Sequence, residues 1–327
     1  MQPTRFLLRA FLPCLFFALV FVPAASTQDY PNRPIRFIVG FPPGGSVDVL
    51  ARAVANEASK TLGQTIVVEN RAGASTNAAS EFVAKERPDG YTVLVASDSI
   101  AINVTLFKNL SFNPLTSFAP VTLAITSPQV LVVRPNFGVT TVAEYLAKLK
   151  ASPGAVNVGL TGRGTIGHLT SELINIKMGG LKVSYVPYTG GAPAVRDLVG
   201  GHIDALYVTL PAVTGSVRGG SILPVAVSSP KRSKAFPDVP TFAETAAREL
   251  AIDSWQGFLV PAGTPQPIID RLNRELVAAL QSEAVAKPLA DVGFEIVAST
   301  SGAFADVIKA DVQRFGDIAR AANINVE

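Results

Sequence analysis

Residues Pro34–Gly63 read PIRFIVGFPPGGSVDVLARAVANEASKTLG, and this stretch decides the fold class. Its first part, Pro34–Gly40, is a short apolar run that predicts a buried strand. A turn rich in proline and glycine follows. Apolar residues then recur every three or four positions from Ser46 onward, which predicts an amphipathic helix that ends at Gly63. Strand, turn and helix in this order are typical of the βα units that build parallel sheets.

The same alternation continues along the chain. Continuous apolar runs such as Ile66–Val68 and Val93–Val95 indicate parallel strands covered on both faces. Further strands are predicted at Thr65–Glu69, Tyr91–Ala96, Val121–Ile125, Val130–Val133, Val156–Leu160, Val183–Tyr188, Ile203–Val208 and Leu223–Ser228. Further helices are predicted after Thr76 to about Glu86, at Val142–Lys150, His168–Met178 and Ala192–Val199, from Pro265, and at Ala303–Ala321.

Two series of βα units, separated by strands that could pass between them, predict an α/β protein of two lobes around a cleft. The C-terminal segment is expected to return to the first lobe, because each lobe alone is small. We therefore expect residues 27–126 and 226–327 to form lobe 1, and residues 127–225 to form lobe 2.

Composition excludes several classes of protein. Of 327 residues, 48% are hydrophobic and 16% are charged, so the chain can bury enough apolar surface to fold. The net charge of +3 comes without a cluster of basic residues, which argues against a nucleic-acid partner. Two histidines and one cysteine are too few for a zinc, iron–sulfur or disulfide framework. We expect neither a metal nor a cofactor.

The N-terminus predicts a cleavable secretory signal peptide over residues 1–26. Arg5 and Arg9 precede the apolar run Ala10–Val22, and small residues follow, with cleavage expected near Ala25 or Ser26. The apolar run is too short for a membrane-spanning helix. The mature protein is thus expected to be exported, without general access to nicotinamide cofactors or ATP.

One loop matches a phosphate-binding fingerprint. Gly162–Gly167 reads GRGTIG after a predicted strand and before a predicted helix. No acidic residue stands about 20 positions on to hold a ribose, which argues against a dinucleotide. Glycines at a helix N-terminus still favour an anion, and similar loops stand at 43–46, 73–77 and 188–191. Each could be an ordinary βα turn, but four of them favour an anion-binding cleft.

No residues suggest nucleophilic hydrolysis, because the chain has no G-x-S-x-G elbow and only two histidines. His168 could contact a ligand or could cap its helix, and His202 is expected to be solvated. Asp48 suits the first turn of a helix. Asp204 could contact a ligand or brace a loop, and Arg71 is expected to form a structural ion pair.

Several motifs resemble the Bug family, the periplasmic solute-binding receptors of tripartite tricarboxylate transporters. The similarity runs in order through nearly the whole mature chain. The matching segments are Phe41-Pro42-Pro43-Gly44-Gly45 with Asp48, Val67-Val68-Glu69-Asn70-Arg71-Ala72-Gly73-Ala74, Pro88-Asp89-Gly90-Tyr91-Thr92, Gly164-Thr165 with His168, Pro237-Asp238-Val239-Pro240-Thr241, and Trp255 with Pro261-Ala262-Gly263-Thr264-Pro265.

This resemblance implies a two-lobed periplasmic-binding-protein fold, type II-like, with a ligand cleft between the lobes that closes on a small carboxylate held by loop amides. The implied first-lobe contacts are Phe41, Gly44, Gly45, Asp48, Ser75, Thr76, Asn77 and Ser97. The implied second-lobe contacts are Thr161, Gly164, Thr165, His168, Asp204 and Thr209. Arg163 could reach a second carboxylate or point to solvent. The segment Ala74–Asn77 departs from the glycine-rich turn that is usual in the family.

The resemblance implies a non-enzymatic receptor that captures an organic acid or amino acid and delivers it to the membrane permease subunits of the transporter. We expect a monomer. Two other classes remain open: a ligand-binding sensor for a signalling partner, and an exported α/β enzyme that acts on a carboxylate.

Overall fold

The computed structural model describes residues 30–245 and 252–324. The predicted signal peptide, residues 1–26, lies outside these residues and stays a prediction. In the described ranges, no helix combines the length and the apolar character that crossing a membrane requires.

Within the described residues, ten strands form one sheet in which eight follow the order β2-β1-β3-β9-β4-β7-β5-β6. Two shorter strands, β8 and β10, pair with β4 outside this path. The strands are β1 Ile35–Val39, β2 Ile66–Asn70, β3 Thr92–Ser97, β4 Phe118–Val133, β5 Asn157–Leu160, β6 Ser184–Pro187, β7 Ala205–Thr209, β8 Leu223–Val227, β9 Asp253–Pro261 and β10 Glu295–Ile296.

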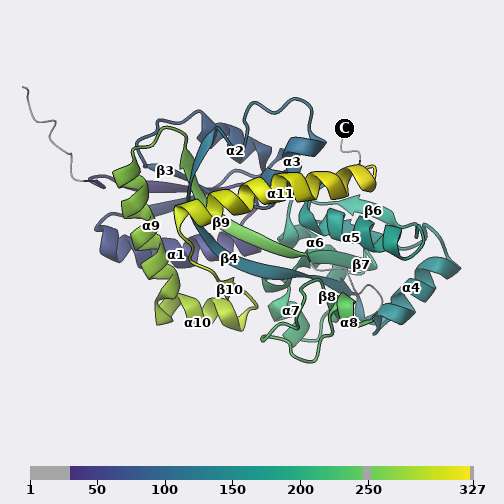
Figure 1. Cartoon of the computed structure of the whole chain (residues 1–327). Helices are drawn as coiled ribbons and strands as arrows, with labels where there is room; N and C mark the ends of the chain where they lie inside the picture. The colour runs from purple at the N-terminus through teal and green to yellow at the C-terminus, as the bar shows by residue number, and fades with distance from the viewer. Residues whose placement is uncertain (1–29, 246–251, 325–327) are drawn as a thin grey trace, which may run out of the picture. The chain divides into compact units, whose positions relative to one another are not determined.

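Helices fill the connections between these strands (Figure 1). They are α1 Ser46–Leu62, α2 Asn77–Ala84, α3 Ser99–Leu106, α4 Val142–Ala151, α5 Ile166–Lys177, α6 Gly191–Val199, α7 Thr214–Arg218, α8 Phe242–Thr245, α9 Gln266–Gln281, α10 Glu283–Asp291 and α11 Ser301–Ala321. The predicted helix from Ser46 ends at Leu62, and Gly63 follows with φ +68°, a left-handed conformation that glycine adopts without strain.

The sheet contains two parallel sets of strands. We call β1–β3 with their helices the first set, in which β1 pairs in parallel with both β2 and β3. We call β5–β7 with their helices the second set, in which β5 pairs in parallel with β6 and β7. The two predicted βα series are these two sets.

Two antiparallel strands join the sets, and Figure 1 shows them side by side. Strand β9 pairs with β3 of the first set, and β4 pairs with β7 of the second. The sequence predicted two separate strands at Val121–Ile125 and Val130–Val133, but β4 is continuous through Pro128. Its partners change there, from β9 up to Pro128 to β7 from Gln129 onward.

Strand β9 was not predicted, since its letters DSWQGFLVP show no clean alternation. Both of its faces are nonetheless buried, and β3 and β4 pair with its two edges. Gly257 is required here: a Cβ at this position would lie 2.4 Å from the ring of Phe304 on α11. The same Phe304 ring meets Trp255 edge-on, with centroids 5.3 Å apart.

Strand β2 differs from its prediction. The run Ile66–Val68 was expected to be covered on both faces, but Val67 is 44% exposed, because β2 lies at the end of the strand order and lacks a second neighbour. Strand β3, with the similar run Val93–Val95, is buried throughout as predicted.

The expected lobe boundary at residue 226 also differs from the packing. Val227 lies in a core cluster with Val130 and Val208, and Phe242 lies in one with Tyr207. Residues on both sides of position 226 therefore pack against the second set, because β8 pairs with the far end of β4.

Candidate functional site

A pocket of about 480 Å³ lies between the two sets, where the loops after β1 and β5 face each other. The carboxyl ends of parallel strands meet at one edge of a sheet, so loops far apart in the sequence converge here. Six of the residues implicated from the sequence line this pocket, namely Phe41, Gly45, Ser97, Thr161, Thr165 and Thr209.

Four helices begin at this pocket: α1 at Ser46, α3 at Ser99, α5 at Ile166 and α6 at Gly191. At none of these four N-termini does the residue before the helix cap it with a side-chain hydrogen bond. The first amide N–H groups of a helix have no partner within the helix and carry partial positive charge. The pocket therefore presents amide donors from both sets to an anion.

Asp48 does not line the pocket but holds the loop that does. Its Oδ2 accepts hydrogen bonds from the Gly44 N–H and from Arg52, both at 3.0 Å, and its Oδ1 accepts one from Asn70 at 2.9 Å. Asn70 also donates to the Phe41 carbonyl. Burial raises the pKa of Asp48, but these hydrogen bonds outweigh it and leave the pKa below its usual value. The ionised Asp48 side chain therefore holds the loop after β1 in place.

His168 plays the corresponding part after β5. Its Nδ1 accepts a hydrogen bond from the Gly164 N–H at 3.1 Å, and its ring meets Tyr185 edge-on at 4.9 Å. Burial and the nearby Arg163 charge lower the pKa of His168 to about 4. The imidazole is therefore neutral near pH 7, and neither it nor Gly164 lines the pocket. The loop is closed further by a hydrogen bond from Thr165 to the Gly162 carbonyl.

A second pocket of about 690 Å³ adjoins the first and shares Phe41 and Thr161 with it. Ser75, Thr76 and Arg163 line it. The Ser75 hydroxyl donates to the Arg163 carbonyl at 2.7 Å, which ties the two sets together across the pocket. The Arg163 side chain is exposed, so it lies at the open side of this second pocket.

The departure from the glycine-rich turn has a structural consequence. Ala74, Ser75 and Thr76 all have positive φ, at +45°, +51° and +78°. Residues with a Cβ adopt this region rarely, and a β-branched residue such as Thr76 is a genuine outlier there. Strained backbone of this kind is held only where the surroundings over-determine it, and here it forms the rim of the second pocket.

Besides Gly44, Asp48, Gly164 and His168, two more residues implicated by the resemblance line neither pocket. Asn77 is buried and accepts a hydrogen bond from Asn103 at 2.7 Å, so it joins α2 to α3. Asp204 is the other. It precedes β7, at the opposite end from Thr209, where it pairs with Arg134 at 2.9 Å and accepts from the Asn157 N–H. Strand direction places it away from the pocket edge.

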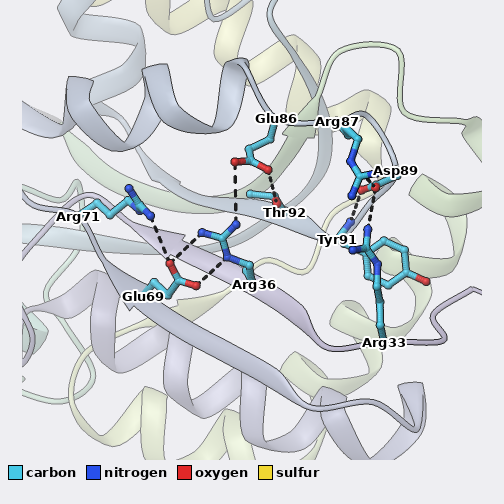
Figure 2. Close-up of polar contacts among 9 residues, drawn as sticks. All are labelled: Arg33, Arg36, Glu69, Arg71, Glu86, Arg87, Asp89, Tyr91 and Thr92. Carbon is cyan, nitrogen blue, oxygen red and sulfur yellow. Dashed lines mark hydrogen bonds and ion pairs between the residues drawn. The ribbon is translucent and has the colours of Figure 1, made fainter.

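Arg71 forms the structural ion pair that the sequence suggested. Its guanidinium lies 3.6 Å from Glu69 and stacks over the ring of Phe82, 3.7 Å from the centroid. Glu69 also accepts two hydrogen bonds from Arg36, and Figure 2 shows Arg71 and Arg36 converging on it. Arg71 lines neither pocket. His202, expected to be solvated, is exposed.

Asp98 lines the first pocket, which we call the main pocket because loops and helices of both sets meet there, and is 1% exposed. Its Oδ2 accepts hydrogen bonds from the Ser254 hydroxyl and from the Trp255 N–H. Burial raises the pKa of Asp98 to about 7, against the effect of these hydrogen bonds and with a further contribution from the charge of Asp311. The pocket thus holds a carboxyl group that titrates near neutral pH.

Six polar pocket residues were not predicted as site residues, and Asp98 and its neighbour Ser99 are two of them. Ser46 could have been found as the first residue of a helix at the glycine loop. Gln129, Ser254 and Gln256 lie inside strands β4 and β9 and carry no motif. Only the pairing of these strands across the centre of the sheet brings them to the pocket.

Comparisons with known proteins place this geometry in a family. A family model described as "Tripartite tricarboxylate transporter family receptor" matches residues 50–324. BugT of Bordetella pertussis is 38% identical over 297 residues, which cover 90% of this chain and 91% of BugT. The solved periplasmic binding protein BugD superposes with a TM-score of 0.87 at 30% identity, over 90% of this chain and 99% of BugD.

A further solved structure, an R. palustris protein with adipate, superposes with a TM-score of 0.88 at 32% identity, over 90% of this chain and 99% of that one. These matches confirm the predicted two-lobed periplasmic-binding-protein fold and the resemblance read from the motifs. The chain therefore belongs to the tripartite tricarboxylate transporter receptor family and is a solute-binding receptor of that family.

Proposed function

We propose that this receptor captures a small carboxylate in the main pocket and delivers it to the membrane subunits of a tripartite transporter. One observation carries the proposal: four helix N-termini, at Ser46, Ser99, Ile166 and Gly191, open onto a pocket that no lysine or arginine lines among the described residues. Backbone amides and hydroxyl groups are then the donors for the anion.

Backbone amides suit a carboxylate because they bind it without a cationic side chain. A buried cationic side chain would itself need an ion-pair partner when the pocket is empty. Hydrogen bonds to a charged group contribute about 1.5–3 kcal/mol each in proteins. The Ser97 hydroxyl, which also lines the pocket, can supplement the amides as a donor. The adipate in the R. palustris relative is a carboxylate of the same chemical class.

We propose that the lobes are divided where β4 and β9 pass between the sets, near Pro128 and Ile252. Pairing and packing support this division: β4 changes partners after Pro128, and Phe242 packs with Tyr207 of the second set. Residues up to 245 then belong with lobe 2. Ligand binding is expected to close the lobes, because the amide donors come from both.

We propose a periplasmic location reached through cleavage of residues 1–26, and a monomer that binds its ligand without transforming it. The relatives are binding and receptor proteins, which supports a non-enzymatic role. Recovery of unchanged ligand after prolonged incubation with the protein would test that point, and conversion of the ligand would contradict it.

Titration calorimetry with adipate, malate and succinate tests whether the protein binds a carboxylate. The variant Gly45→Val tests whether the backbone amides of α1 bind it. A Cβ at Gly45 meets nothing closer than the Pro42 carbonyl at 3.8 Å, so the fold tolerates the change while the valine side chain obstructs the first amides of α1. Gly302→Val is the matched control, since that position on α11 is exposed and has open space.

We expect one-to-one binding of at least one acid, loss of at least about a hundredfold in affinity for Gly45→Val, and no change for Gly302→Val. Full affinity in a folded Gly45→Val protein would refute binding of the carboxylate by the backbone amides of α1. A wild-type protein that binds no acid in a broad carboxylate panel would refute the proposed function.

A further inference from the structure

Two buried glutamines line the main pocket with one amide atom each unsatisfied. Gln129 on β4 is 2% exposed and Gln256 on β9 is 1% exposed. The Gln129 Nε2 donor and the Gln256 Oε1 acceptor have no hydrogen-bond partner within the described part of the chain. The Gln256 side chain is otherwise held by its hydrogen bond to Ser46, so its unsatisfied oxygen is a property of the pocket.

Leaving such atoms without a partner is unfavourable. A buried donor or acceptor that lacks its hydrogen bond has lost its contact with water without a replacement, and most buried polar groups are therefore paired. Two unsatisfied atoms of opposite character in one pocket point to a ligand group that satisfies both.

Gln256 contacts the start of α1, and Gln129 lies on the strand beside that contact. Gln256 donates from Nε2 to the Ser46 hydroxyl at 2.9 Å, and Thr209 donates to the same oxygen at 2.9 Å. Thr209 on β7 is in turn the direct strand partner of Gln129 on β4. The Gln129 Oε1 faces Gly167 of α5, 3.3 Å from where a Cβ would stand. Gln256 thus lies at the first turn of α1, and Gln129 lies beside the first turn of α5.

We propose that Gln129 and Gln256 select a carboxylate that also carries a hydroxyl group near the carboxylate. This inference rests on the proposed function and narrows its ligand class. A hydroxyl accepts one hydrogen bond and donates one, so it can accept from Gln129 Nε2 and donate to Gln256 Oε1.

Other common substituents satisfy only one of the two atoms. A second carboxylate or a carbonyl accepts from Gln129 but places an oxygen against the Gln256 oxygen. An ammonium donates to Gln256 but has no lone pair for Gln129. A plain methylene group satisfies neither, and both amide atoms then stay buried without a partner.

Calorimetry on two matched pairs of acids tests the proposal: malate against succinate, and lactate against propionate. Each pair differs by one hydroxyl. We expect the wild-type protein to prefer the hydroxy acid by at least about tenfold in the pair that fits the pocket. Gln256→Met keeps the length of the side chain but removes the acceptor, and it should reduce that preference to less than about threefold.

Gln266→Met is the control, because Gln266 is an exposed residue of α9 that receives the same chemical change. It should retain the full preference. Equal binding of the two acids of a pair by wild type overturns the inference while leaving the carboxylate proposal intact. Tighter binding of aspartate than of malate also overturns it, since the Gln256 oxygen would then serve an ammonium. Failure of all acids to bind, adipate included, overturns the proposed function and this inference together.

Discussion

The buried carboxyl of Asp98 should make the stability of the protein depend on pH in a defined direction. Its pKa is about 7 in the folded protein and near 3.8 when the chain is unfolded. Between these values the folded protein holds a proton that the unfolded chain has released. The free energy of unfolding therefore decreases as the pH rises from about 4 to about 7, and the contribution of Asp98 is constant above that range.

The magnitude follows from the same two values. A difference of about 3 pKa units at about 1.4 kcal/mol per unit corresponds to about 4 kcal/mol of stability lost across this range. Asp98→Asn removes the titrating group while an amide oxygen can still accept from Ser254 and Trp255. Relative to the variant, the wild type should thus become less stable by about 4 kcal/mol between pH 4 and pH 8.

Urea unfolding at several pH values measures this difference. Trp255 is the only tryptophan of the chain, and its backbone N–H donates to Asp98, so its fluorescence reports on this region. Other titrating groups are common to both proteins, and their contributions largely cancel in the difference. A difference in unfolding free energy that stays constant from pH 4 to pH 8 would show that Asp98 is ionised throughout, and the argument from burial would be refuted.

Three further predictions concern the pockets and their surroundings. In calorimetry, Arg163→Ala should weaken binding of a dicarboxylate by about tenfold and leave binding of a monocarboxylate unchanged, with Arg87→Ala at an exposed position as the charge control. Equal losses of affinity for both acids would contradict a contact between Arg163 and the second carboxylate. Arg71→Ala should lower the unfolding free energy by about 1 kcal/mol or less and leave the affinity for the carboxylate unchanged, because Arg71 pairs with Glu69 and lines neither pocket. Lost affinity with an unchanged melting temperature would argue against carboxylate binding by backbone amides. Small-angle scattering should show a smaller radius of gyration with a saturating carboxylate, and an identical radius would exclude hinge closure.

Local sequence patterns were sufficient for the βα units and for the loops that bear on the pocket. The helix from Ser46, the turn at Gly63 and the buried strand β3 all follow from periodicity and glycine placement within a few residues. The glycine-rich loops also indicated helix N-termini facing an anion, and the structure brings three such N-termini to one pocket. These features depend on residues that are close in the sequence, so they can be predicted from the sequence alone.

Only the tertiary structure decided which strands lie at the centre of the sheet. Strand β9 has no periodicity of its own, and its pairing with β3 and β4 places it at the centre of the sheet. That pairing places Gln256 in the pocket, as the pairing of β4 with β7 places Gln129 there. For Asp204 the sequence left open whether it contacts a ligand or braces a loop, because the end of β7 at which it lies depends on strand direction. The sequence by itself determined the units and their loops, whereas strand order and direction, which depend on contacts between distant residues, decided which side chains meet in the pocket.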